Sequence, residues 1–251
     1  MKKVFKSSLF SQSILLPAAA SILAFYLVFS FDAHGKDANS IEDNLEEVRT
    51  EQEFNNKLLI SNKDVIYSNK AKQALMSKLS DIDYINAKFS QVVVNEEGEI
   101  LQEGYGTLAI SKPNLVNWHT TEPEETLIIS DGTSLWFYDP FIDQVSLYSF
   151  NRSIVNTPVL LLTSEDPSLW NNYQVSKGQN NSYVIHSLDS NSQVQSLELS
   201  FDNQQLSKLS LVDSTGQVSH ISLIDIDFIT EPKVSLFEFT VLEGITVDDQ
   251  R

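Results

Sequence analysis

Residues able to bind a metal ion occur at two places in the chain. Asp225 and Asp227 form a D-x-D pair of carboxylates, and Glu122, Glu124 and Glu125 could supply oxygen ligands for calcium. The aspartates stand on a segment of alternating apolar and polar residues, where both would face solvent. A charged hairpin turn accounts for the glutamates without a metal. We therefore expect no metal site.

His119 is the residue most suited to general-base chemistry, because it follows Trp118 and is one of few histidines. A hydrolase built on His119 and either Asp131 or Asp139 is the enzyme alternative. No histidine has another histidine or a carboxylate four residues away at a helical metal spacing, and the chain lacks G-x-S-x-G, phosphate-loop and dinucleotide-binding motifs. We therefore expect no catalytic residue, no cofactor and no enzyme.

The stretch Asp131 to Phe141, DGTSLWFYDPF, concentrates large aromatic residues in an acidic chain. In a strand, Trp136 and Tyr138 would share one face, and Leu135 and Phe137 the other. Both faces would then be apolar. This favours a sheet covered on both sides, or a sheet with one face wrapped around an apolar ligand.

Composition excludes several classes of protein. The 251 residues have a formal net charge of -17, so clustered basic residues for nucleic acid are missing. Cysteine is absent, which rules out disulfides and thiolate catalysis. Hydrophobic residues make up 41% of the chain, enough for one sizeable core.

The N-terminal residues 1–35 are typical of a signal peptide, because lysines at the start precede a long apolar stretch and small residues near Gly35. The segment between Ser7 and Phe31 carries no charge and could also span a bilayer, so an uncleaved anchor is the alternative. Residues 36–68 are acidic and rich in Asn and Glu, and we expect a linker or an extra N-terminal segment there. The remaining domain would be residues 69–251.

The apolar spacing of Leu75, Leu79, Ile82, Ile85 and Phe89 predicts an amphipathic helix over 69–91. After this helix the period changes to two, with turn signals every 8 to 15 residues or so, which is typical of an antiparallel meander. Clean alternation predicts strands over 197–201, 224–228 and 237–241, and Thr157-Pro158 predicts the start of a short apolar helix over 157–163.

These patterns predict a mainly β fold with some α structure: one strongly curved antiparallel sheet with helices available to cover its concave face. Motifs in the same order resemble the LolA family of periplasmic outer-membrane lipoprotein carriers. They are KPNLVNWH from Lys112, DG at Asp131, LWFY from Leu135 with Pro140-Phe141, NTP from Asn156, and VDDQR from Val247. The resemblance covers about Lys70 to Arg251.

The resemblance implies an unclosed half-barrel whose helices form a lid over a hydrophobic cavity for acyl chains. It implies a monomer in the periplasm that chaperones triacylated lipoproteins, with an inner-membrane ABC transporter as donor and an outer-membrane receptor lipoprotein as acceptor. Lys112 would be the lid latch, where the family usually has arginine. A module for another envelope lipid or glycolipid is the alternative. The residues we expect to line the cavity are Leu79, Ile82, Phe89, Leu115, Trp118, Trp136, Tyr138, Phe141, Leu160 and Leu161.

Overall fold

The computed structural model describes residues 69–156 and 158–251. The expected signal peptide over 1–35, the acidic segment over 36–68 and the capping residue Thr157 lie outside the described residues. No helix within the described part of the chain is long and apolar enough to cross a membrane.

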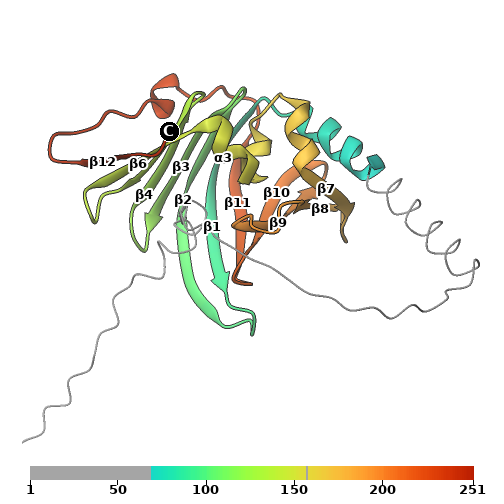
Figure 1. Ribbon diagram of the computed structural model, residues 1–251. Coiled ribbons are helices and arrows are strands. Elements are labelled where there is room, and N and C mark those ends of the chain that lie inside the picture. The colour runs from blue at the N-terminus through green and yellow to red at the C-terminus, as the bar shows by residue number, and fades with distance from the viewer. Residues whose placement is uncertain (1–68, 157) are drawn as a thin grey trace, which may run out of the picture.

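A single twelve-stranded sheet, curved and unclosed, forms the body of the protein (Figure 1). Its spatial order is β12-β6-β5-β4-β3-β2-β1-β11-β10-β9-β8-β7. All neighbouring strands are antiparallel, as predicted, except that β12 pairs parallel with β6. The strands are β1 (Tyr84–Val94), β2 (Ile100–Ser111), β3 (Leu115–Glu122), β4 (Thr126–Asp131), β5 (Ser134–Asp139), β6 (Gln144–Ser149), β7 (Tyr173–Lys177), β8 (Ser182–Ser187), β9 (Val194–Asp202), β10 (Gln205–Asp213), β11 (Val218–Asp227) and β12 (Thr246–Asp249).

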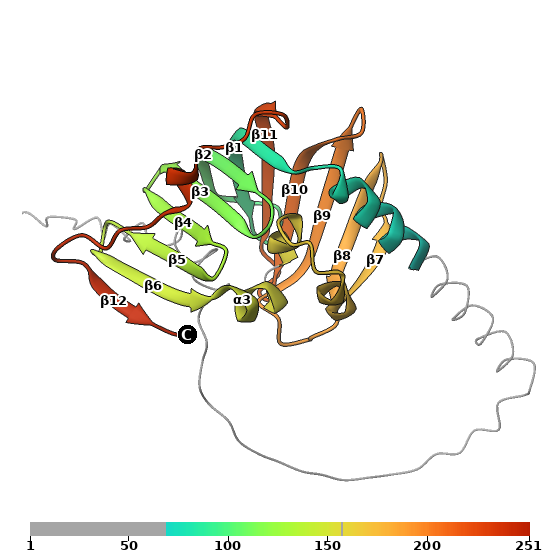
Figure 2. The same ribbon diagram turned by 90° about the horizontal axis from the view of Figure 1, so that it is seen from above.

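Helical segments lie over the concave face of this sheet (Figure 2). They are a helix over 69–80, α3 (Phe150–Asn156), and the 3-10 helices η1 (Pro158–Leu162) and η2 (Pro167–Asn172). Residues Leu75, Leu79, Phe150, Leu161 and Trp170 of these segments belong to one buried cluster with the inward residues of the strands. The predicted short helix after Pro158 is confirmed as η1.

The first helix is shorter than predicted, because it ends at residue 80 and β1 begins at Tyr84. Ile85, Ala87 and Phe89 are all buried and alternate along β1. Apolar residues four positions apart fit both a helix with 3.6 residues per turn and a strand with a period of two. Pairing with β2 on one side and β11 on the other decides in favour of the strand.

Two of the three predicted strands need correction. Leu197, Leu199 and Phe201 are buried in β9 as expected. In β11, Asp225 has a φ of 53° next to a shift in register, so Ile224 faces outward with 44% of its surface exposed.

The predicted strand over 237–241 is not part of the sheet. The chain forms a 3-10 helix, η3 (Val234–Phe237), and then runs extended without a ladder partner. Phe237 is buried while Glu238 is exposed, so the alternation is present even though the ladder is not.

The convex face carries a smaller apolar layer under the C-terminal segment, residues 228–251. Here η3 lies against β3 and β4, and Phe239 lies on β5. Asn117 Nδ2 donates to the Leu236 carbonyl at 2.6 Å, and β12 then pairs with β6. The C-terminal segment therefore covers the convex face at strands β3 to β6, opposite the side on which the helices lie.

One close approach on the concave face depends on glycine. A Cβ at Gly106 of β2 would lie 2.5 Å from the Phe89 ring and 2.1 Å from the His119 carbonyl oxygen. The missing side chain lets Phe89 lie across β2 and meet Trp118 of β3, with ring centroids 4.8 Å apart. This aromatic pair forms part of the core that faces the helices.

Candidate lipid-binding site

The concave face is the candidate site, because it joins the largest set of apolar side chains to helical segments instead of a second sheet. From the sheet come Phe89, Leu108, Val116, Trp118 and Phe137, all at most 5% exposed. The helical segments contribute, among others, Ala71, Leu75, Leu79, Leu160, Leu161, Leu162 and Trp170.

The structure brings together six of the ten residues predicted to line a cavity. Leu79, Phe89, Trp118, Leu160 and Leu161 lie in the buried cluster of the concave face, and Ile82 packs against it partly buried. These residues come from four separate elements and from the turn after the first helix. The spacing of these residues in the sequence predicted the period of each element, but not which elements meet.

The other four predicted residues lie elsewhere. Trp136 stacks on Phe239 of the C-terminal segment with ring centroids 5.4 Å apart, and Tyr138 packs on the same ring in a tilted arrangement at 5.5 Å. Leu115 precedes the inward Val116 and lies beside Gly132, and Phe141 is 78% exposed in the turn after β5. We correct the assignment of Trp136 and Tyr138: Leu135 and Phe137 of the same strand face the concave cluster instead.

The sequence analysis separated the two faces of β5 and placed Trp136 and Tyr138 on the concave side, whereas they lie on the side covered by the C-terminal segment. Alternation shows which residues share a face but not which face is concave, and Phe239, which covers Trp136, is about a hundred positions away in the chain. The helical spacing found Leu75 as part of an apolar stripe. Trp170 and Lys72 gave no signal in the sequence analysis.

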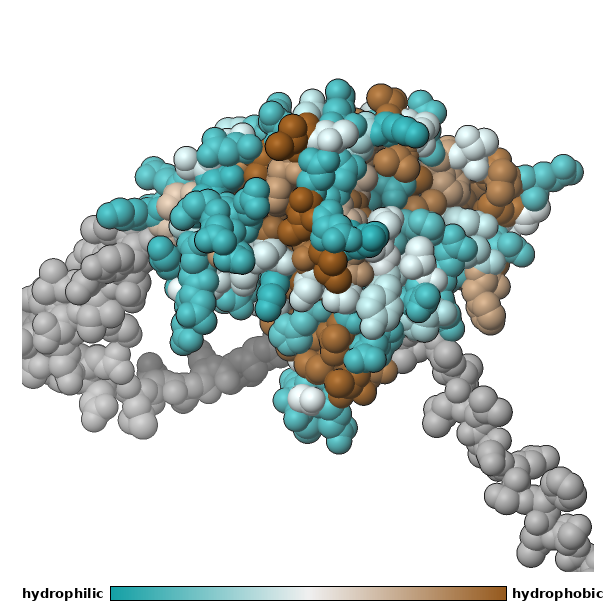
Figure 3. Space-filling view, turned by 180° about the vertical axis from the view of Figure 1, so that it is seen from behind, coloured by the Kyte–Doolittle hydropathy of each residue, from teal (hydrophilic) through white to brown (hydrophobic). Residues whose placement is uncertain are grey.

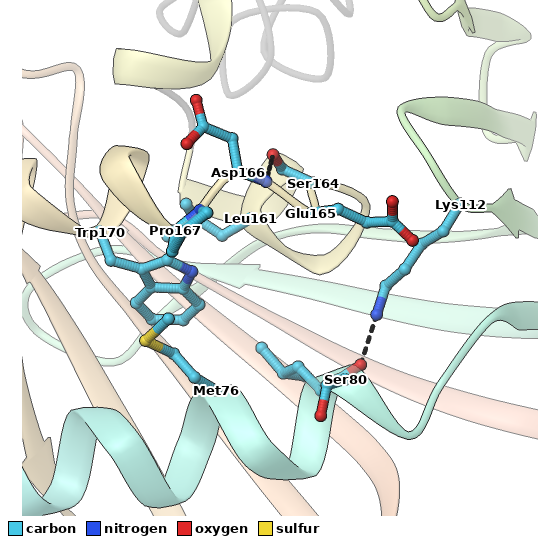
Figure 4. A pocket seen from close by; sticks show the side chains of 10 residues that line it. Met76, Ser80, Lys112, Leu161, Ser164, Glu165, Asp166, Pro167 and Trp170 are labelled. Atoms are coloured by element: carbon cyan, nitrogen blue, oxygen red, sulfur yellow. Dashed lines mark hydrogen bonds between the residues drawn. The ribbon is translucent and has the colours of Figure 1, made fainter.

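A small cavity of about 180 Å³ lies between the first helix and the segment from η1 to η2 (Figure 4). Met76 and Leu79 of the helix face Leu161 and Trp170 across it, and Lys112 and Glu165 stand at its polar side. A second cavity, of about 380 Å³, lies on the other side of the helix end and is lined by Lys78, Asp81, Ile82, Gln204, Gln205 and Phe228. The helix therefore has incompletely filled space on two sides.

Lys112 connects the turn after β2 to the end of the first helix. Its Nζ donates a hydrogen bond to the Leu79 carbonyl, and its backbone N–H donates to the Asp83 carbonyl at 3.0 Å. Burial lowers the pKa of the Lys112 ammonium, although Asp83, Glu165 and Asp81 act in the opposite direction. The Leu79 carbonyl also accepts the Ile82 N–H at 3.2 Å, so the lysine adds a second donor at the end of the helix.

The turn that carries Lys112 also holds η1. Asn114, with a φ of 65°, donates its backbone N–H to the Thr163 carbonyl at 3.0 Å. The Thr163 hydroxyl donates to the Leu160 carbonyl at 2.8 Å. The single turn between β2 and β3 therefore contacts both the first helix and the segment after η1.

The candidate chemical groups do not assemble into a catalytic or metal site. His119 Nε2 lies 2.8 Å from Glu125 Oε1 at the surface, whereas Asp131 pairs in register with Leu115, four positions along β3. Asp139 is buried, and its Oδ1 accepts the Phe141 N–H at 2.9 Å. The described residues contain no group of three or more histidine, cysteine, aspartate or glutamate side chains placed to hold a metal ion.

The D-x-D pair has structural partners of its own. Asp225 forms an exposed ion pair with Lys88 at 2.8 Å. Asp227 accepts the backbone N–H groups of Ile229 and Thr230, at 2.8 Å and 3.0 Å, in the turn that leaves β11. Both carboxylates therefore have a local structural role at the end of β11.

Comparison with known proteins decides the family. The model of the family described as outer membrane lipoprotein carrier protein LolA matches residues 80–240. The chain belongs to the LolA family.

Relatives within this LolA family agree over most of their length. An outer-membrane lipoprotein carrier protein of Shewanella loihica is 39% identical over 178 residues, which cover 71% of this chain and 85% of that protein. One of Vibrio parahaemolyticus is 37% identical over 181 residues, covering 72% and 86%. A solved LolA superfamily protein of Nitrosomonas europaea matches 67% of the chain at 12% identity with a TM-score of 0.43, too low a likeness to support further conclusions.

Proposed function

We propose that this protein is a periplasmic chaperone that binds the acyl chains of lipoproteins released from the inner membrane and carries them to an outer-membrane receptor. The observation that carries the proposal is the concave apolar sheet face, covered by short helical segments, in a chain of the LolA family. An inner-membrane ABC transporter would load the carrier, and a receptor lipoprotein would unload it. The carrier would act as a monomer and without catalysis.

The physical task is to hide an acyl chain from water. Burying a methylene contributes about 0.8 kcal/mol, so one palmitoyl chain needs roughly 12 kcal/mol of apolar contact before its lipoprotein can cross an aqueous space. Side chains such as Phe89, Trp118 and Phe137 supply an apolar wall of the required kind. The negative charge of the chain would keep the loaded carrier away from anionic membrane surfaces.

The structure describes a form in which this wall is already covered. The cavity of about 180 Å³ beside Leu161 is smaller than typical ligand pockets of roughly 300–1,000 Å³. We propose that the helix over 69–80 and the segment from η1 to η2 form a lid that separates when cargo enters. Lys112 would be one latch of this lid, through its bond to the Leu79 carbonyl.

The test is transfer of a real lipoprotein. The purified protein is incubated with ATP-supplied spheroplasts whose lipoproteins are radiolabelled, and the soluble fraction is then mixed with outer membranes. We expect a soluble complex of protein and acylated lipoprotein that passes its cargo on. A folded protein that instead co-purifies with loose lipid, and releases no lipoprotein, would favour the alternative of a binding module for another envelope lipid.

A further inference from the structure

Lysine side chains fasten the first helix to its surroundings towards both ends: Lys72 at one end, and at the other end Lys112 together with Lys78, whose Nζ donates to Gln204 Oε1. Lys72 Nζ donates to the Trp170 carbonyl of η2 at 2.8 Å, and the Leu79 carbonyl accepts a bond from Lys112. Lys72, Met76 and Leu79 share one helix face because they are four and three residues apart. In Figure 4 the thioether of Met76 points towards the Trp170 ring, so packing accompanies the bond.

The acceptor of the Lys72 bond is held in place by the sheet. The Trp170 carbonyl also accepts the backbone N–H of Tyr173, the first residue of β7, and the Trp170 side chain is only 4% exposed. Asp166 Oδ1 accepts the Ser168 N–H at 2.8 Å and thereby caps the start of η2. The η2 segment is thus a fixed support against which the helix rests.

The bonds at the two ends of the helix lie at different distances from the point where the chain enters β1. Residues 81–83 lead from the helix into β1, and the bond from Lys112 N–H to the Asp83 carbonyl ties this end down. At 1.5 Å per residue, Lys72 lies about 15 Å from this tie and Leu79 about 5 Å. A rotation of about 20° would therefore move Lys72 by roughly 5 Å and Leu79 by roughly 2 Å.

Displacements of these two sizes have different effects on a hydrogen bond. A shift of roughly 5 Å takes Lys72 beyond the distance at which a bond to Trp170 exists. A shift of roughly 2 Å at Leu79 lies within the reach of the flexible lysine side chain that follows it. The Lys72 bond must break when the helix swings away, whereas the Lys112 bond can persist.

We propose that Lys72 is the positioning residue that holds the lid closed, and that the acyl chain enters along the seam between the helix over 69–80 and η2 once its bond to Trp170 breaks. The role of the seam as an entry path rests on the proposed carrier function. The role of Lys72 in closing the seam does not. Lys112, beside the pivot, guides the swing and contributes less to closure.

The test measures the width of the seam directly. The chain has no cysteine, so spin labels attach only to introduced ones, and Gln73→Cys with Ser168→Cys places two exposed labels on opposite sides of the seam. We expect Lys72→Met to raise the ratio of long to short label distances about tenfold, equivalent to about 1.4 kcal/mol. Lys112→Met should raise it less, and Lys72→Arg should leave it near the wild-type value.

Lys70→Met is the matched control, because Lys70 is an exposed lysine on the same helix. It should leave the distances unchanged. The proposal is overturned if Lys72→Met leaves the distances as in the wild type while circular dichroism shows a folded protein, or if Lys112→Met opens the seam more than Lys72→Met.

A second readout separates this inference from the proposed function. Binding of a triacylated lipopeptide is measured for the same variants, and we expect faster loading and faster release for Lys72→Met. If the wild type binds no lipopeptide, the carrier function and the entry path are overturned. The label distances still test whether Lys72 holds the seam closed. If lipopeptide loads at the wild-type rate in a variant whose seam is open, the entry path is overturned.

Discussion

At the scale of single residues, Asp131 has a structural role in a turn. Its Oδ1 accepts the N–H groups of Thr133 and Ser134, at 2.8 Å and 2.7 Å, and its Oδ2 accepts the Trp136 indole N–H at 3.2 Å. Burial alone would raise the pKa of Asp131, but these donors and Arg251 outweigh it and lower the pKa. The carboxylate therefore fixes the turn between β4 and β5.

We expect Asp131→Asn to lower the free energy of unfolding at pH 7 by about 1 kcal/mol, because the charge-assisted bonds are weakened. A carboxyl whose pKa is lowered in the folded state stabilises the fold above its unfolded pKa, and this contribution disappears as pH falls through the folded value. The difference between wild type and variant should therefore shrink below about pH 4. Urea unfolding at pH 7 and at pH 3 measures it, with Asp143→Asn as control, and a difference independent of pH would contradict the assignment.

At the scale of elements, the C-terminal segment acts as a cover for the convex face. Phe237 is buried, and Phe239 stacks on Trp136 and Tyr138. Asn86 Nδ2 donates to the Thr230 carbonyl at 2.6 Å, and Gln250 N–H donates to the Leu147 carbonyl at 2.8 Å. The segment is thus anchored near both ends, with aromatic contacts between them.

We expect Phe239→Ala to lower the free energy of unfolding by about 1–2 kcal/mol and to raise acrylamide quenching of tryptophan fluorescence, because the contacts with Trp136 and Tyr138 are lost. The other two tryptophans, Trp118 and Trp170, are only 4% exposed, so added quenching reports on Trp136. Leu242→Ala is the control, since Leu242 is 62% exposed in the same segment. Equal effects of the two substitutions would show that the ring contacts do not anchor the cover.

At the scale of the whole molecule, stability should be uneven. Strands β1, β2 and β11 each have a ladder partner on both sides at the centre of the sheet. The helix over 69–80 contacts the rest through the Leu75 face and through the bonds of Lys72, Lys78 and Lys112. The β1–β2 hairpin projects from the body, and Figure 3 shows apolar side chains gathered at its tip, where Ile100 and Leu101 are exposed.

We expect amides of residues 72–80 to exchange with deuterium at least about ten times faster than those of β1 and β11, because a lid opens without unfolding of the sheet. Addition of a triacylated lipopeptide should widen this difference. Hydrogen exchange with mass spectrometry gives both rates, and strand β7 at the sheet edge serves as an internal comparison. A helix as slow to exchange as β1 would show that it is a fixed part of the core.

Local patterns in the sequence were enough for the strand-rich meander, the short helix after Pro158, the family and the two faces of β5. The strands, the helix and the faces of β5 each depend on residues near one another in the chain, and the family on the order of several short motifs. The end of the first helix was missed because Ile85 and Phe89 fit both a helical period and a strand period. The outward direction of Ile224 was missed because the bulge at Asp225 depends on the partner strand. Such choices are made by hydrogen bonds between strands.

What the sequence by itself determined is that the chain builds one curved sheet with apolar residues for both faces. Only the tertiary structure decided which face of β5 meets the helical segments, because the C-terminal segment with Phe239 occupies the other one. It also decided that Lys72 reaches a carbonyl 98 positions away. Alternation and periodicity describe one element at a time, whereas both of these features depend on contacts between elements that only the folded chain brings together.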